Sequence, residues 1–209
     1  MTTQKEFFET VNPATEEVEN TYEKHSSEDV EEILTEADET FNEWNTKRIE
    51  ERESLLSEAA DVLRDRKREY AETMTCEMGK PVSQAVAEVE KCAWVCDYYA
   101  ERAGEHLQDE RIGGEPGTKT YARYEPLGVV LAVMPWNYPF WQVFRFAAPA
   151  LAAGNVGILK HASNVPGCAL AIQDVFDRAG FPEGAFSALL VDSGDVDGVI
   201  RDDRVRAVT

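Results

Sequence analysis

The second half of the chain alternates short apolar runs with segments of helical spacing, and this alternation constrains the fold most. The apolar runs predict strands over residues 129–134, 156–160, 186–191 and 205–208. The segments between them predict helices over residues 140–153, 165–179 and 195–200. Strands that alternate with helices form βαβ units around a parallel sheet. The sequence therefore predicts an α/β domain in this half.

The first half is expected to be mainly helical. Apolar residues at helical spacing predict one helix from Ser26 or Ser27, and further helices over 49–78 and 82–106. Gly79 and Pro81 separate the last two, as expected for a helix end followed by a helix start. Before them, "VNPATEEV" is a turn between two short extended pieces. After them, "QDERIGGEPGTKT" is expected to be a loop and "KTYARYEP" a strand.

The chain is strongly acidic, with 40 acidic and 21 basic residues and a net charge of −19 over 209 residues. This excess argues against nucleic-acid binding, because phosphate contacts need a positive surface. No apolar run approaches the roughly 20 residues that span a membrane, and no secretory signal is visible, so we expect a cytoplasmic location and no membrane partner. Two interpretations of the charge stay open: a solvated surface, or halophilic adaptation to a salty cytoplasm.

The four cysteines are Cys76, Cys92, Cys96 and Cys168. Cys92 and Cys96 share a helix face rather than forming a CxxC pair, and no histidines stand at zinc-ligand spacing. The sequence therefore predicts buried, reduced thiols and no metal site.

The strand expected over 129–134 is followed by the segment "PWNYP", so Asn137 lies just past the end of the strand. Ligand sites of open α/β sheets lie beyond the carboxyl ends of their strands. The asparagine amide offers two N–H donors, and Pro135 and Pro139 restrict the backbone on each side of it. Two interpretations stay open: Asn137 stabilises an oxyanion, or it only turns the chain or caps the following helix.

Four blocks of the sequence together resemble the aldehyde dehydrogenase superfamily. They are "VNPATEEV", "EMGKPVSQAVAEVEKCAWVCDYYAE", "MPWNYPFWQVFR" and "LAAGNVGILKHASNVPG", and they occur in the family's order. The resemblance covers essentially the whole chain. Within the superfamily, "LKHA" in place of the usual "LKP" is most similar to succinate-semialdehyde dehydrogenases. The resemblance implies a cofactor-binding domain with a helical N-terminal half followed by βαβ units of a parallel sheet.

The resemblance also implies roles for individual residues. Asn137 corresponds to the family's oxyanion-stabilising asparagine, and Lys160 to the lysine that hydrogen-bonds the cofactor ribose. A surface lysine is the alternative for Lys160. Met134, Pro135 and Trp136 correspond to the segment along the cofactor, with Trp136 also lining the substrate tunnel. Core packing and a turn would explain these three residues equally well.

Three further residues bear on which cofactor and substrate the resemblance implies. Ser163 stands where NAD-preferring members often carry a glutamate; a serine does not repel a 2′-phosphate, so NADP or NAD is expected, with NADP tolerated. A helix-start role is its alternative. His161 replaces the usual proline, and both a phosphate-binding and a structural role stay open. Arg145 corresponds to the arginine that holds the substrate's distal carboxylate, unless it pairs with a local acid.

The family's nucleophilic cysteine and its water-activating glutamate lie in the later half of its members, and none of the four cysteines here has the nucleophile's sequence context. We therefore expect residues 1–209 to be the N-terminal part of the cofactor-binding domain, truncated before the catalytic domain and inactive alone. The intact protein is expected to be a homo-oligomer that oxidises a small aldehyde, with 118–126 as an oligomerisation strand. Two alternatives stay open: a remnant that binds nucleotide weakly, and an acidic interaction module.

Overall fold

A computed structural model describes residues 5–114 and 117–209. The first half begins with an antiparallel hairpin and continues with four helices: β1 (Phe7–Val11), β2 (Val18–Glu23), α1 (Ser27–Trp44), α2 (Ile49–Asp65), α3 (Lys67–Met78) and α4 (Val82–His106). A second hairpin and the βαβ units follow: β3 (Glu110–Ile112), β4 (Thr120–Ala122), β5 (Val129–Met134), α5 (Trp141–Ala152), β6 (Val156–His161), α6 (Pro166–Arg178), β7 (Phe186–Ala188), α7 (Val196–Ile200) and β8 (Val205–Val208). The predicted α/β class is confirmed.

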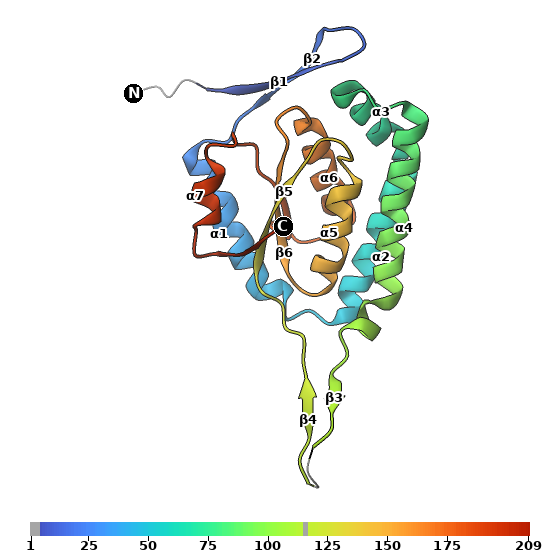
Figure 1. Ribbon diagram of the computed structural model, residues 1–209, viewed down its shortest axis with the longest axis vertical. Helices are drawn as coiled ribbons and strands as arrows, with labels where there is room; N and C mark the ends of the chain where they lie inside the picture. Colours follow the sequence, from blue (N-terminus) through green and yellow to red (C-terminus); the bar gives the residue numbers. More distant parts are fainter. Residues whose placement is uncertain (1–4, 115–116) are drawn as a thin grey trace.

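The centre of the molecule is a four-stranded parallel sheet with the order β7-β6-β5-β8. The chain runs outward from β5 to β7 and then returns to place β8 on the other side of β5. Helices α5 and α6 cover one face of the sheet, and α1 packs on the opposite face (Figure 1). Helices α2, α3 and α4 form an outer layer against α5 and α6. The order reverses between β5 and β8, so the loop after β5 borders a topological switch point, where ligands bind in such sheets.

Strand β6 is buried along its whole length, which explains why its sequence does not alternate between apolar and polar residues. Glycine at 157 makes room for a ring on the neighbouring strand, because a Cβ there would lie 3.0 Å from the Phe186 ring. Aromatic contacts extend the core from Phe140 through Phe144 to Phe176 on α6. The sheet and its helices thus form a rigid base for the loops at the carboxyl ends of the strands.

The helix predicted over 49–78 is wrong as a single element. It breaks at Arg66, whose backbone (φ −107°, ψ 12°) leaves the helical region between α2 and α3. The break lets α3 contact α6 and β1, while α2 packs along α4 and α5. The apolar spacing continues across this point, so periodicity alone gave no sign of the bend.

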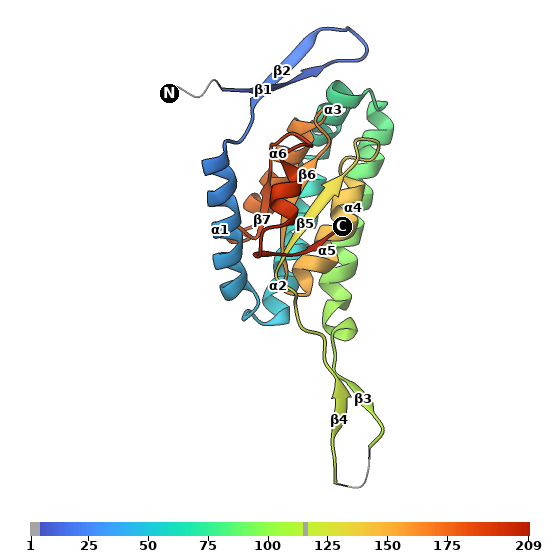
Figure 2. The same ribbon diagram turned by 60° about the vertical axis from the view of Figure 1, so that its left-hand side comes forward.

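The segment predicted to be a loop before "KTYARYEP" contains a strand. Glu110–Ile112 pairs with Thr120–Ala122, so the predicted strand is shorter than expected and has a partner within the chain. The two strands form a hairpin that projects from the body of the molecule (Figure 2). Ile112 and Tyr121 on it are about half exposed. Oligomerisation through 118–126 stays a prediction, and residues 115–116 of this turn lie outside the described residues.

Three of the cysteines are buried as predicted, and Cys76 is half-buried. Burial raises the pKa of the Cys92, Cys96 and Cys168 thiols, so they stay protonated and are poor nucleophiles. Within residues 5–114 and 117–209, no group of three His, Cys, Asp or Glu side chains could hold a metal ion. None of the described helices is long and apolar enough to cross a membrane.

Candidate active site

The loops after β5 and β6 start side by side at the carboxyl edge of the sheet. The parallel register pairs Val133 with Lys160 and Met134 with His161. The segment "PWNYP" leaves from the first strand, and "ASN" leaves from the second. The structure therefore places the starts of the loops that carry Asn137 and Ser163 next to each other, as the sequence predicted for a ligand site.

Asn137 lies in the turn between β5 and α5, and its side chain is exposed. Helix α5 has Phe140 at its N-cap and no side-chain cap from the preceding turn. Capping of the helix by Asn137, part of the second interpretation, is therefore wrong. Within the described part of the chain, no hydrogen bond holds the Asn137 carboxamide, whereas its main-chain carbonyl accepts one from Lys80 (3.2 Å). The amide donors are free for a ligand, while the backbone that carries them is held.

Glu88 on α4 provides the cap that Asn137 does not. Its Oε1 accepts hydrogen bonds from the main-chain N–H groups of Phe140 (3.0 Å) and Trp141 (2.9 Å), at the start of α5. Its Oε2 pairs with the Lys80 ammonium, and both side chains are buried (Lys80 8% and Glu88 5% exposed). The ammonium also lies 4.0 Å from the centre of the Tyr138 ring. A buried ion pair thus supports the whole turn from Asn137 to Trp141.

His161 closes β6 and is buried, with 4% of its surface exposed. Its Nδ1 accepts a hydrogen bond from the Ala162 N–H (2.9 Å), so its Nε2 carries the proton and donates to the Pro139 carbonyl (2.9 Å). Burial lowers the pKa of His161 to about 4, so the ring is neutral at physiological pH. Of the two interpretations, the structure shows the structural one: His161 ties the end of β6 to the turn after β5.

Lys160 lies at the end of β6, with 7% of its surface exposed, so most of its side chain is buried. The alternative of a lysine whose stem is buried and whose ammonium reaches the surface stays open. No described residue accepts a hydrogen bond from its ammonium group. Burial lowers its pKa, partly offset by the negative charge of Asp192. The side chain is thus largely buried while its ammonium keeps unused donors, and ribose hydroxyls are acceptors that such donors could bind.

Ser163 is exposed in the turn before α6, whose N-cap is Val165. The helix-start role is therefore wrong for Ser163. Glu77 on α3 takes that role from outside the helix: its carboxylate accepts hydrogen bonds from the Gly167 (2.8 Å) and Cys168 (2.9 Å) N–H groups. A side chain at Gly167 would leave no room for this carboxylate, because a Cβ there would lie 2.6 Å from Glu77 Oε1.

The remaining predicted residues vary in burial. Met134 is half-buried, whereas Pro135 and Trp136 are exposed, so core packing does not explain those two. Arg145 is exposed on α5, and among the described residues no carboxylate forms an ion pair with it. The interpretation that Arg145 pairs with a local acid is therefore not supported, and its guanidinium is free for another anion.

One pocket of the structure lies away from these residues. It has a volume of about 930 Å³ and lies between the β1–β2 hairpin, the start of α1 and the segment after β7. Its lining carries both charges, including Lys24 and Asp192, which pair with each other at 2.5 Å. Asn137, Arg145 and Lys160 do not line this pocket. Asn137 and Lys160 lie instead where two neighbouring loops leave the carboxyl edge of the sheet.

Sequence reasoning missed Lys80, Glu77 and Glu88 as parts of the site. For Glu88 a signal was present, because it falls within the buried stripe of α4 formed by Ala85, Val89 and Cys92. A glutamate on an apolar helix face needs buried donors, and those donors are the N–H groups of α5.

Comparison with known proteins agrees with the fold. The aldehyde dehydrogenase family matches over residues 1–209. A probable NADP(+)-dependent succinate-semialdehyde dehydrogenase from Synechocystis sp. is 52% identical over 200 residues, covering 96% of this chain and 44% of the relative. The NADP(+)-dependent succinate-semialdehyde dehydrogenase 1 of Mycobacterium tuberculosis is 47% identical with the same coverage.

Among solved structures, succinic semialdehyde dehydrogenase from Streptococcus pyogenes in complex with NADP+ superposes with a TM-score of 0.92 at 35% identity. It covers 96% of this chain, and this chain covers 44% of it. The chain thus spans about 44% of the length of these relatives. The sequence blocks, the sheet and these matches together show that the chain belongs to the aldehyde dehydrogenase family.

Proposed function

We propose that this chain forms the cofactor-binding part of an enzyme that oxidises succinate semialdehyde to the dicarboxylic acid with NADP. The supporting observation is the juxtaposition at one sheet edge of Lys160, a largely buried lysine whose ammonium has no acceptor among the described residues, and Asn137, whose exposed amide has no hydrogen bond among them. The names of the relatives from Synechocystis sp. and M. tuberculosis support the same substrate and cofactor.

The residues at the sheet edge fit a dinucleotide. The Lys160 ammonium would donate to the ribose hydroxyls, and Ser163 would face the 2′ position, where no carboxylate repels a phosphate. The bound nicotinamide would supply the chemistry of hydride acceptance. Met134, Pro135 and Trp136 would lie along the cofactor, with Trp136 also facing the substrate.

The substrate would be held at its two ends by this chain. The Asn137 amide would donate to the aldehyde oxygen and stabilise the negative charge that develops there. The Arg145 guanidinium would hold the distal carboxylate with two parallel hydrogen bonds. An aldehyde without that carboxylate would lose the second contact only.

Nucleotide binding is tested by titrating the chain with NADP+ and with NAD+ while following tryptophan fluorescence, since Trp136 and Trp141 lie next to the site. We expect NADP+ to bind, and Lys160→Met to weaken both nucleotides. Ser163→Glu should weaken NADP+ by about tenfold or more relative to NAD+, because a carboxylate repels the 2′-phosphate. Equal binding of both nucleotides by wild type and S163E would contradict the assignment of Ser163.

Turnover is tested in the whole protein with succinate semialdehyde and, as a control, butyraldehyde. Asn137→Ala should lower kcat on both aldehydes by about a hundredfold or more, because an oxyanion donor is lost. Arg145→Gln should raise KM for succinate semialdehyde and leave butyraldehyde unchanged. A weakly binding remnant or an acidic interaction module predicts no turnover at all.

The remaining expectations concern the assembly and the compartment. We propose that the hairpin of β3 and β4 takes part in a homo-oligomer and that the enzyme acts in the cytoplasm. The exposed Ile112 and Tyr121 support the first proposal. Light scattering of wild type and of the Ile112→Ser/Tyr121→Ser double variant tests it, and an unchanged mass would contradict it.

A further inference from the structure

The turn from Asn137 to Trp141 rests on three buried ionisable side chains that come from three separate parts of the chain. Lys80 lies in the connection between α3 and α4, Glu88 lies on α4, and His161 ends β6. All three are more than nine-tenths buried. We call Lys80, Glu88 and His161 the loop anchor.

The loop anchor binds the backbone of the turn at four main-chain atoms. Lys80 donates to the carbonyl of Asn137, and His161 donates to the carbonyl of Pro139. Glu88 accepts from the N–H groups of Phe140 and Trp141. The anchor therefore fixes the main chain on both sides of Tyr138 and directly at Asn137.

Gly79 lets the chain turn so that the side chain of Lys80 is buried inside the protein. It ends α3 with φ 76°, a left-handed conformation that glycine adopts without strain. A Cβ at this position would lie 2.8 Å from Pro13 Cγ in the turn of the first hairpin. The chain therefore reverses sharply at Gly79, and the next residue enters the interior.

Stability alone is a poor reason for such an arrangement. Taking two charges out of water is costly, and well-packed apolar residues in place of a buried ion pair are often neutral or stabilising. What a buried, fully hydrogen-bonded pair provides is one defined geometry, because any other loop position leaves a charge or an N–H unsatisfied. In enzymes, displacement of a catalytic group by about 1 Å lowers the rate substantially.

We propose that the loop anchor is a set of positioning residues that hold the Asn137 amide in the place where it stabilises the aldehyde oxygen. This inference rests on the proposed function for the role of Asn137, and it extends that function to three residues that touch neither substrate nor cofactor. Lys80 and Glu88 act through the main chain of the turn, and His161 couples that turn to the strand that carries Lys160.

Hydrogen exchange of the chain itself tests the anchor without any turnover. The informative variant is the double substitution Lys80→Met/Glu88→Gln, which removes both charges at similar volume and leaves no unpaired ion in the core. We expect amides of residues 138–142 to exchange at least about tenfold faster, whereas those of β6 and the midpoint of unfolding stay as in wild type. The single variant Lys80→Arg, which keeps the positive charge and the hydrogen-bond donors beside Glu88, should retain most of the wild-type protection.

The matched control is Glu77→Gln. Glu77 is also a buried glutamate that caps a neighbouring helix, but the main-chain N–H groups that donate to it among the described residues belong to Gly167 and Cys168 and not to the turn. It should leave exchange at 138–142 unchanged. Wild-type exchange at 138–142 in a folded Lys80→Met/Glu88→Gln variant would overturn the proposal, as would an equal effect of Glu77→Gln.

Kinetics of the whole protein give a second, separate readout. The double variant should lower kcat about tenfold to a hundredfold and change KM for NADP+ less than about twofold, because the amide is displaced but the nucleotide contacts remain. An unchanged kcat would overturn the proposal. If wild type does not oxidise succinate semialdehyde, the proposed function fails, and the exchange experiment still decides whether the anchor orders the turn.

Discussion

Glu77 and Glu88 carry out the same task for two adjacent helices of the sheet. Glu77 accepts hydrogen bonds from the first N–H groups of α6, and Glu88 accepts them from the first N–H groups of α5. Neither helix has a side-chain cap from its own preceding turn. The turn that carries Asn137 therefore leads into a helix capped by Glu88 of α4, and the turn that carries Ser163 leads into a helix capped by Glu77 of α3.

Glu77→Ala should therefore destabilise the fold. It removes the acceptor for the Gly167 and Cys168 N–H groups and leaves both donors buried, so we expect a loss of about 2 to 3 kcal/mol of unfolding free energy. Glu77→Gln keeps an acceptor and should lose about 1 kcal/mol or less. Urea unfolding measures both. The control is Glu72→Ala on the exposed side of the same helix, where an effect as large as that at Glu77 would contradict the prediction.

Lys160→Met should stabilise the unliganded chain. The substitution replaces a largely buried lysine, whose ammonium is desolvated in part and has no hydrogen-bond acceptor among the described residues, with an apolar side chain of similar length. We expect a gain of about 1 kcal/mol in unfolding free energy, together with a loss of NADP+ affinity of about tenfold or more. Thermal unfolding with and without NADP+ measures both effects. A destabilised K160M chain would show that the lysine is satisfied within the fold.

His161 should make stability depend on pH between about 6.5 and 4. Burial and the nearby Lys160 charge lower its pKa from 6.5 to about 4, so the unfolded state binds this proton first as the pH falls. The stabilisation is complete above pH 6.5 and is lost progressively down to about pH 4, by roughly 3 kcal/mol.

The His161→Gln variant isolates this effect, because glutamine can donate to the Pro139 carbonyl but does not titrate. We expect the difference in unfolding free energy between wild type and H161Q to shrink or reverse as the pH falls from 7 to 4. The contributions of the other titrating groups cancel in this difference. A difference that is constant over this range would refute a buried, neutral histidine.

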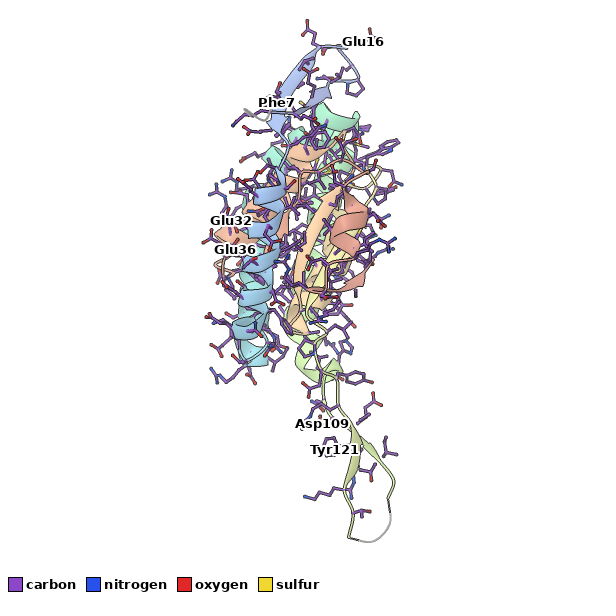
Figure 3. All side chains as sticks on the ribbon, turned by 90° about the vertical axis from the view of Figure 1, so that its left-hand side faces the viewer. Phe7, Glu16, Glu32, Glu36, Asp109 and Tyr121 are labelled. Atoms are coloured by element: carbon purple, nitrogen blue, oxygen red, sulfur yellow. The ribbon has the colours of Figure 1, made fainter. Side chains whose placement is uncertain are left out.

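Salt should stabilise the protein, because α1 carries a line of acidic residues. Glu32 and Glu36 lie along its outer side (Figure 3), and Glu183 approaches the same surface. Partial burial and the neighbouring carboxylates raise the pKa of Glu36. Raising KCl from 0.1 M to 2 M screens this repulsion and should raise Tm by several degrees. The Glu32→Gln/Glu36→Gln variant should respond less, and equal responses would contradict the prediction for this surface.

The sequence predicted all four strands of the sheet, because each contains apolar residues between turn signals, although the strand predicted over 186–191 ends at Ala188. The residues of β5 and β8 match the prediction, since both are bounded by turn or polar residues at each end. Strand β3 was not predictable in the same way. It has three exposed residues and owes its existence to pairing with β4, which is a tertiary contact rather than a local preference.

The positions of Asn137 and Lys160 could be predicted from the sequence, whereas the residues that support the turn could not. Asn137 lies just past the end of β5 and Lys160 near the end of β6, so the strand pattern placed both at the sheet edge. The loop anchor depends on contacts between residues far apart in the chain, such as Glu88 with Phe140 and His161 with Pro139. No periodicity encodes such contacts, and only a charged residue on an apolar helix face gave a hint of them.

The capping carboxylates of Glu77 and Glu88 also determine how strongly this edge of the sheet attracts an anion. A free helix N-terminus carries about half a positive charge and is the usual cradle for a phosphate in α/β proteins. At α5 and α6 that positive end already faces a glutamate, so neither helix attracts a diphosphate. Along this stretch of the edge, the attraction for a nucleotide in the proposed site would therefore come from the side chain of Lys160 and not from the helix dipoles.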